Sequence, residues 1–209
     1  MGQAPIPHVV ELATPHGPAR AHLHPVASPR AALVLGHGAG GGVQAPDLRA
    51  AAAAARAEGV FVVLVEQPYR VAGRRSPAPA AQLDAAWTAV VGELRAGAVA
   101  ALPLLVGGRS SGARVACRTA SATGASGVLC LAFPLQPPRR KDGRLPPSRL
   151  EELDAVGVPV LVVQGARDHF GIPPGAPGRT VVEVGGTHSL RGDLVPLRAA
   201  VGAWLRRLL

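Results

Sequence analysis

The segment that most constrains the fold is Gly-Arg-Ser-Ser-Gly at residues 108–112, which centres on Ser110. An apolar run at residues 102–107 precedes this segment, and a helix-like stretch at residues 113–122 follows it. The two glycines would let a helix pack closely on a strand. The pattern therefore predicts a sharp strand-to-helix turn that displays the Ser110 hydroxyl as a nucleophile, although a serine at this place could also be an ordinary helix N-cap.

Two further polar residues follow the ends of later apolar runs. Residues 158–163 are predicted to form a buried strand that leads to Asp168, and residues 179–184 a strand that leads to His188. Open α/β sheets place their sites at the carboxyl ends of their strands, so Ser110, Asp168 and His188 are expected to meet there. Glu66, which ends an earlier predicted strand, is the rival acid, but the order serine, aspartate, histidine favours Asp168.

A glycine-rich loop follows the predicted strand at residues 31–36 and begins with His37. Glycines allow backbone N–H groups to approach a substrate oxygen closely. We expect the amide of Ser111, at the start of a helix, to be one donor of an oxyanion hole. Ala39 is the first candidate for the second donor and Gly40 the alternative. His37 either ties down this loop or contacts the substrate.

These motifs carry a resemblance that spans nearly the whole chain. Its matching pieces are His37-Gly38-Ala39-Gly40-Gly41, Gly107-Gly108-Arg109-Ser110, Pro134-Leu135-Gln136-Pro137-Pro138, Val163-Gln164-Gly165-Ala166-Arg167-Asp168 and Gly185-Gly186-Thr187-His188-Ser189. The chain resembles small, lid-less α/β hydrolases of the dienelactone-hydrolase-like kind. More narrowly, it resembles the branch that contains testis-expressed proteins and the NSL histone-acetyltransferase complex subunit. It departs from that branch at three positions, where methionine, glycine and histidine are expected instead of Ser111, Ala113 and Gln136.

Apolar runs and helical patterns alternate along the chain, which predicts an α/β fold with a mostly parallel sheet covered by helices on both faces. Residues 9–13 and 19–24 are expected to form an antiparallel hairpin at its edge. The further strands are expected at residues 31–36, 60–66, 102–107, 127–132, 158–163 and 179–184, and the helices at residues 46–58, 80–96, 113–122, 147–156 and 194–209. No repeat or linker divides this pattern, so residues 1–209 are expected to form a single α/β-hydrolase domain.

Lids of α/β hydrolases usually enter after the sixth strand, which corresponds here to residues 133–148. This stretch is rich in proline and too short for a cap domain, so the site is expected to be open. An open site suits small or exposed ester-like substrates. Arg109, beside the nucleophile, is expected either to contact an anionic acyl group or to lie at the surface or cap the sheet.

Composition restricts the class of protein further. The chain has 48% hydrophobic residues, enough for a full core at 209 residues, and no long uncharged apolar run or basic N-terminal region. We therefore expect no membrane span or signal peptide and a cytoplasmic location. In that compartment Cys117 and Cys130 are expected to be buried, reduced packing residues. Neither an acidic nor a cysteine cluster accompanies His22 and His24, so no metal site is expected.

The net charge of +9 does not by itself indicate a nucleic-acid partner. Nearly all of the basic residues are arginine, in a chain rich in alanine, glycine and proline, which indicates biased genomic composition. The densest basic stretch, residues 139–144, has no interleaved aromatic residues on which bases could stack. The sequence thus favours a serine hydrolase of small acyl compounds that needs no cofactor, and the competing class is a non-catalytic interaction module with the same fold.

Overall fold

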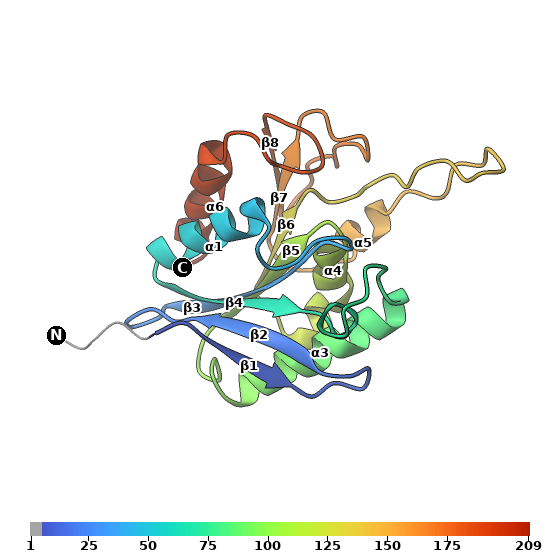
Figure 1. Ribbon diagram of the computed structural model, residues 1–209. Helices are drawn as coiled ribbons and strands as arrows, with labels where there is room; N and C mark the ends of the chain where they lie inside the picture. The colour runs from blue at the N-terminus through green and yellow to red at the C-terminus, as the bar shows by residue number, and fades with distance from the viewer. Residues whose placement is uncertain (1–5) are drawn as a thin grey trace.

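The computed structural model describes residues 6–209 and is built around one eight-stranded sheet (Figure 1). The strand order is β1-β2-β4-β3-β5-β6-β7-β8. The strands β3 to β8 run parallel to one another, and the hairpin of β1 and β2 adds an antiparallel edge beside β4. The bounds are β1 His8–Leu12, β2 Ala19–His24, β3 Ala31–Gly36, β4 Val60–Glu66, β5 Leu104–Arg109, β6 Gly127–Leu131, β7 Val160–Gly165 and β8 Arg179–Val184.

Helices cover both faces of this sheet, as Figure 1 shows. On one face, α1 and α6 lie side by side over a core that contains Leu35, Leu64 and Trp204. On the other face, α3 and α4 pack over a core that contains Val34 and Val106 of the sheet and Trp87 of α3. The helix bounds are α1 Pro46–Ala57, α2 Pro68–Val71, α3 Ala80–Ala96, α4 Ser111–Thr123, α5 Leu150–Asp154 and α6 Val195–Leu208. The predicted α/β architecture is therefore confirmed.

The central strands form because most of their residues are apolar, with valine and leucine prevailing. Every residue of β3, β6 and β7 is buried, as expected for strands whose two faces are both covered by helices. The edge strand β1 instead leaves most of its residues exposed. The central strands are thus enclosed between two layers of helices. The candidate site lies at the carboxyl ends of these strands.

Several predicted boundaries were wrong. The strand expected at residues 102–107 is β5, Leu104–Arg109, because its glycines pair on both sides, with β3 and with β6. The helix expected at residues 147–156 is only α5, Leu150–Asp154, and the residues directly before it, which include two prolines, form neither helix nor strand. The short helix α2, which begins at Pro68, was not predicted.

The connection at residues 132–149, where a lid would enter, contains no helix or strand until α5 begins. Figure 1 shows it extending away from the body of the molecule. It therefore does not cover the carboxyl ends of the strands, in agreement with the expected open site. Across residues 6–209, none of the helices combines the length and apolar character that a membrane crossing requires.

Candidate active site

The turn between β5 and α4 holds Ser110 in a strained backbone conformation. Its φ of 51° and ψ of −108° lie in a region that residues with a side chain rarely adopt. The glycines on either side permit this turn, because a Cβ on Gly108 would lie 2.5 Å from the carbonyl oxygen of Gly36. A Cβ on Gly112 would come too close to the same carbonyl. The spacing of the two glycines thus follows from the contact of α4 with the end of β3.

A continuous chain of hydrogen bonds joins Ser110, His188 and Asp168. The Oγ atom of Ser110 lies 2.9 Å from Nε2 of His188, and Nδ1 of His188 lies 2.8 Å from Oδ2 of Asp168. A carboxylate at Nδ1 can only accept, so Nδ1 carries the proton and Nε2 accepts the bond from the serine hydroxyl. The structure therefore brings together the three residues that the sequence analysis singled out, in the geometry of a nucleophile, a base and an acid that orients the base.

The carboxylate of Asp168 is fully buried and receives further hydrogen bonds. The backbone N–H of Phe170 donates to Oδ1 at 2.9 Å, and Nε2 of Gln164 donates to Oδ2 at 2.8 Å. Gln164 is itself buried at the end of β7, where its amide also faces the carbonyl oxygens of Phe133 and Gly171. Sequence reasoning missed this role, although a polar residue in an otherwise apolar strand was a signal that could have shown it.

The aromatic ring of Phe170 also fixes the imidazole of His188. The two ring centres lie 4.5 Å apart at an angle of 62°, an edge-to-face contact. His169, to which the sequence analysis gave no role, contacts His188 in the same way at 5.7 Å. The loop after β7 therefore supplies both the acid and the side chains that flank the base.

The loop after β3 is held by three side-chain contacts. Nδ1 of His37 donates to the carbonyl oxygen of Gly38 at 2.8 Å, and Nε2 of His37 accepts from the backbone N–H of Gln67 at 3.1 Å. The hydroxyl of Tyr69 donates to the carbonyl oxygen of Ala39 at 2.9 Å. Burial raises the pKa of Tyr69 to about 12, so this hydroxyl remains a donor. The two hydrogen bonds of His37 give it a structural role, because they hold this loop in place.

The anchored carbonyls also orient the candidate oxyanion donors. In a trans peptide the N–H points opposite to the carbonyl of the preceding residue. The bonds to the Gly38 and Ala39 carbonyls therefore direct the N–H groups of Ala39 and Gly40 away from His37 and Tyr69. Among residues 6–209, neither of these amides nor that of Ser111 forms a hydrogen bond. All three remain available to a substrate oxygen.

The contacts of His37 predict a loss of stability in acid. Burial of the ring lowers the pKa of His37, and Nε2 must stay unprotonated to accept from Gln67. Because the unfolded chain binds this proton more readily, we expect the free energy of unfolding to fall as the pH drops below about 6.5. Urea unfolding at pH 7.5 and 5.5 would measure this loss, which should be smaller for His37→Gln. An equal loss in both proteins would contradict the role given to His37.

Arg109 connects three parts of the site. Its Nε donates to Oδ2 of Asp47 at 2.9 Å, and its Nη2 donates to the carbonyl oxygen of His188 at 3.1 Å. The guanidinium also lies against Gly38, where a Cβ would come within 2.6 Å of Nη1. Burial raises the pKa of the Asp47 carboxyl, and the charge of Arg109 opposes this shift. These bonds hold the guanidinium against the protein, and no pattern in the sequence indicates Asp47 as its partner.

Other charged residues considered from the sequence lie apart from this chain of hydrogen bonds. Glu66, the rival acid, lies 3.3 Å from Nε2 of His22 at the edge of the sheet. Across residues 6–209, no group of three or more potential metal-ligating side chains is found. The geometry of the site therefore rests on the Ser110, His188 and Asp168 side chains and on the backbone amides around them.

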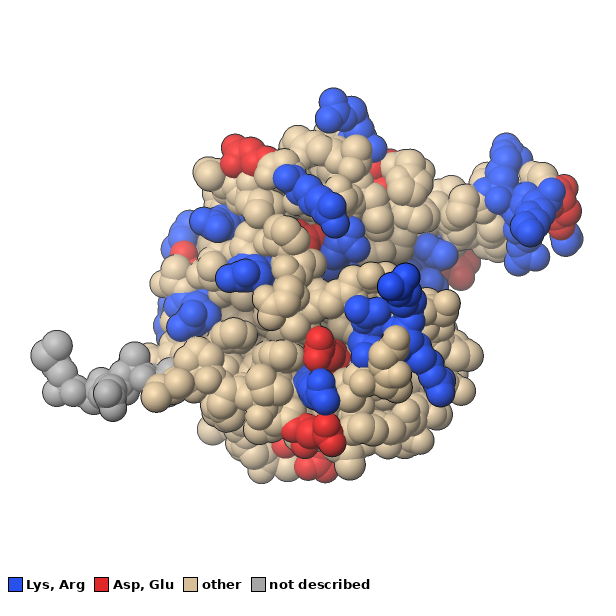
Figure 2. All heavy atoms as spheres, viewed as in Figure 1, with Lys and Arg blue, Asp and Glu red and all other residues tan. Residues whose placement is uncertain are grey.

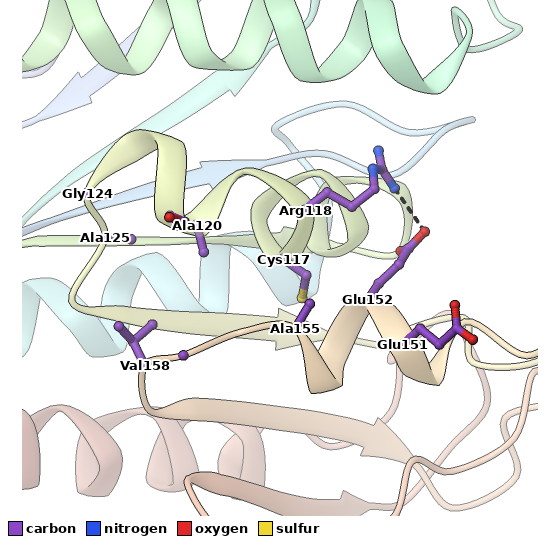
Figure 3. A pocket seen from close by; sticks show the side chains of 11 residues that line it. Cys117, Arg118, Ala120, Gly124, Ala125, Glu151, Glu152, Ala155 and Val158 are labelled. Atoms are coloured by element: carbon purple, nitrogen blue, oxygen red, sulfur yellow. Dashed lines mark hydrogen bonds and ion pairs between the residues drawn. The ribbon is translucent and has the colours of Figure 1, made fainter.

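A cavity of about 740 Å³ lies away from Ser110. Figure 3 shows it between the second half of α4 and α5, with Cys117 pointing toward Ala155 and with Arg118 paired to Glu152 at its rim. Cys117 and Cys130 are buried free thiols whose sulfur atoms are 3.5 Å apart. The hydrogen bond with Cys117, together with burial, raises the pKa of Cys130, which disfavours its thiolate. These are the properties of packing residues.

The fold and the arrangement at its strand ends are those of an α/β hydrolase. The model of the family "Alpha/beta hydrolase domain" matches residues 29–177, and the chain belongs to this family. The matched range contains Ser110 and Asp168, whereas His188 lies beyond it. No curated protein matches the sequence.

Solved structures of lid-less and related hydrolases share the fold along almost the whole chain. XC6422 from Xanthomonas campestris, described as an α/β serine hydrolase without a lid, is 23% identical with a TM-score of 0.77 over 97% of this chain and 95% of that one. A dienelactone hydrolase from Anabaena variabilis is 14% identical with a TM-score of 0.74, covering 98% of this chain and 99% of that one. Est1E from Butyrivibrio proteoclasticus is 15% identical with a TM-score of 0.75, covering 96% and 98%.

Proposed function

We propose that the protein is a serine hydrolase that cleaves small carboxylic esters or related acyl compounds. The observation that carries this proposal is the hydrogen-bonded chain from Ser110 through His188 to Asp168, with distances of 2.9 and 2.8 Å. The strained turn at Ser110 and the unpaired amides beside it add support, because acyl transfer needs an exposed nucleophile and donors for an oxyanion.

In the proposed reaction, Oγ of Ser110 attacks the carbonyl carbon while Nε2 of His188 takes the hydroxyl proton. Asp168 keeps the imidazole in the required tautomer and stabilises the imidazolium that forms. The amides of Ser111 and Ala39, with Gly40 as the alternative to Ala39, bind the oxyanion. The intermediate then expels the alcohol, which receives the proton from His188 and leaves an acyl group on Ser110. Water, deprotonated by His188, attacks this ester, and the carboxylic acid is released as His188 returns the proton to Oγ of Ser110.

Small substrates fit the open edge of the sheet. The connection at residues 132–149 extends away from the body, so it offers no cover for a long acyl chain (Figure 1). A side pocket beside the glycine-rich loop, of about 440 Å³, is lined by glycines 40–42, Asp47, Arg109 and Arg191. Its wall is polar, which favours a short or polar group over an aliphatic tail.

We expect hydrolysis of p-nitrophenyl acetate and butyrate by the purified protein, with a decline for the octanoate and dodecanoate esters. Each methylene buried in an enclosed pocket is worth about 0.8 kcal/mol, and an open site forgoes most of this gain. Values of kcat/KM across the series, measured below the micelle concentration of each ester, would test the prediction. Labelling by a fluorophosphonate probe would test the nucleophile independently of the choice of ester.

The alternative is a non-catalytic interaction module, as the resemblance to the branch of testis-expressed proteins and the NSL complex subunit implies. We retain that narrower affiliation as a proposal. A module has no need of a buried carboxylate aligned on a histidine that in turn contacts a serine, and this argues for catalysis. Folded protein that shows neither probe labelling nor hydrolysis across esters and thioesters would favour the interaction module.

A further inference from the structure

A smaller pocket, separate from Ser110, lies between α1 and the outer part of the sheet. It has a volume of about 250 Å³, and its apolar floor is formed by alanines of α1 and a leucine of β4. Its polar wall consists of His22 and His24 from β2, Arg49 and Arg56 from α1, and Gln44 from the segment before α1. The pocket forms because α1 packs on this face over the part of the sheet from β4 to β5, while β2 lies beyond the helix, next to β4 (Figure 1).

The periodicities of α1 and β2 bring four basic side chains to the wall of this pocket. Arg49 and Arg56 are seven residues apart, close to two helical turns, and therefore lie on the same side of α1. His22 and His24 alternate along β2 and therefore share one face of the strand. The two pairs face one another across the groove between the helix and the strand.

The uncompensated positive charge of this pocket comes from its two arginines. No carboxylate belongs to its lining, and among residues 6–209 neither Arg49 nor Arg56 forms an ion pair. Of the two histidines, His22 faces an acid, because Oε2 of Glu66 lies 3.3 Å from its Nε2. Burial, then the charges of Arg56, His22 and Arg49, lower the pKa of His24. Figure 2 shows basic side chains gathered on the same face over α1 and the C-terminal helix.

We propose that this pocket binds the phosphate group of a small phosphomonoester. Two guanidinium groups supply two permanent charges and paired N–H donors, which match the charge and the geometry of a phosphate dianion. The Gln44 amide and the His24 imidazole add donors around the same space. The pocket is larger than one phosphate group, which leaves room for a short organic part over the apolar floor.

The position of Gln44 places this ligand next to the candidate active site. Gln44 lines both the phosphate pocket and the cavity beside glycines 40–42. A phosphomonoester bound here would therefore contact the segment that continues the oxyanion loop. The phosphate site itself stands on its own residues and does not depend on the proposed hydrolysis.

Calorimetric titration with inorganic phosphate and with glycerol 3-phosphate, at an ionic strength fixed by sodium chloride, tests the site. We expect saturable binding of one ligand, which Arg49→Gln combined with Arg56→Gln weakens by about tenfold or more. Both arginines are exposed, so this variant should fold. The matched control is Arg198→Gln combined with Arg207→Gln on α6, which removes the same charge and should change the affinity by less than about twofold.

A second measurement follows His24 directly by NMR. Bound phosphate offsets the field of Arg49 and Arg56, so the pKa of His24 should rise when phosphate is added. Equal loss of affinity in both double variants, or a His24 pKa that phosphate does not change, would overturn the proposal in favour of general attraction to a basic protein. Binding to phosphatidate vesicles without binding to glycerol 3-phosphate would overturn the small phosphomonoester in favour of a lipid headgroup.

Discussion

Replacing Ser110 with alanine is expected to abolish labelling by a fluorophosphonate probe and to lower kcat for short esters by at least about a thousandfold. The substitution removes the oxygen that lies 2.9 Å from Nε2 of His188, while the strained turn and the backbone amides stay in place. Alanine also removes no contact that holds the fold, because the side chain of Ser110 caps no N–H of α4. Thermal unfolding should therefore show a folded protein.

Ser121→Ala is the matched control for this experiment. Ser121 lies near the far end of α4 and is exposed, so replacing it makes the same chemical change, loss of one serine hydroxyl, away from the site. We expect it to be labelled and to hydrolyse esters as the unaltered protein does. Labelling that persists in Ser110→Ala would place the reactive residue elsewhere and would remove the basis of the proposed mechanism.

Much of the fold could be predicted because uninterrupted apolar runs indicate the buried strands of the sheet. The apolar run at residues 158–163 predicted a buried strand, and every residue of β7, Val160–Gly165, is buried. The mostly parallel direction of the later strands followed from their alternation with helical segments, whereas the N-terminal hairpin was predicted from two short strand-like runs with no helix between them. Boundaries were less accurate at β5, where Gly107 and Gly108 interrupt the apolar pattern but continue the hydrogen-bonded ladder.

The members of the candidate triad could be predicted because each follows a strand end. A residue just past a parallel strand lies at one edge of the sheet whatever its distance along the chain. Asp168 and His188 are therefore brought near Ser110 by topology alone, across separations of 58 and 78 residues respectively, as the numbering shows. The position of a residue relative to the end of a predicted strand can be determined from a single sequence.

The supporting contacts could not be predicted in the same way. Arg109 forms a hydrogen bond with Asp47, which is 62 residues away in the sequence. This pairing depends on how α1 packs beside the turn between β5 and α4. The contact of Tyr69 with the Ala39 carbonyl similarly depends on the short helix α2, which no periodic pattern predicted. Such contacts depend on how individual side chains pack in the folded protein. They become recognisable only once the structure shows that a charged or polar group is buried.

Asp168→Asn is expected to lower kcat by a factor of about 10³ to 10⁴ while the protein remains folded. The reason lies in the donors that surround this side chain. Nδ1 of His188 and Nε2 of Gln164 both approach Oδ2, and the backbone N–H of Phe170 approaches Oδ1. A carboxylate accepts on both oxygens, whereas an amide accepts on one side and donates on the other. In either orientation of the new amide, at least one of these three hydrogen bonds is therefore lost.

The tautomer of His188 makes this effect large. If the asparagine NH₂ faces Nδ1, the imidazole must carry its proton on Nε2 and can no longer accept from Ser110. Glu66→Gln is the matched control, because it makes the same chemical change at the rival acid, which contacts His22 instead. Steady-state kcat for p-nitrophenyl acetate should change little there. A large loss in Glu66→Gln with little in Asp168→Asn would transfer the role of the acid to Glu66.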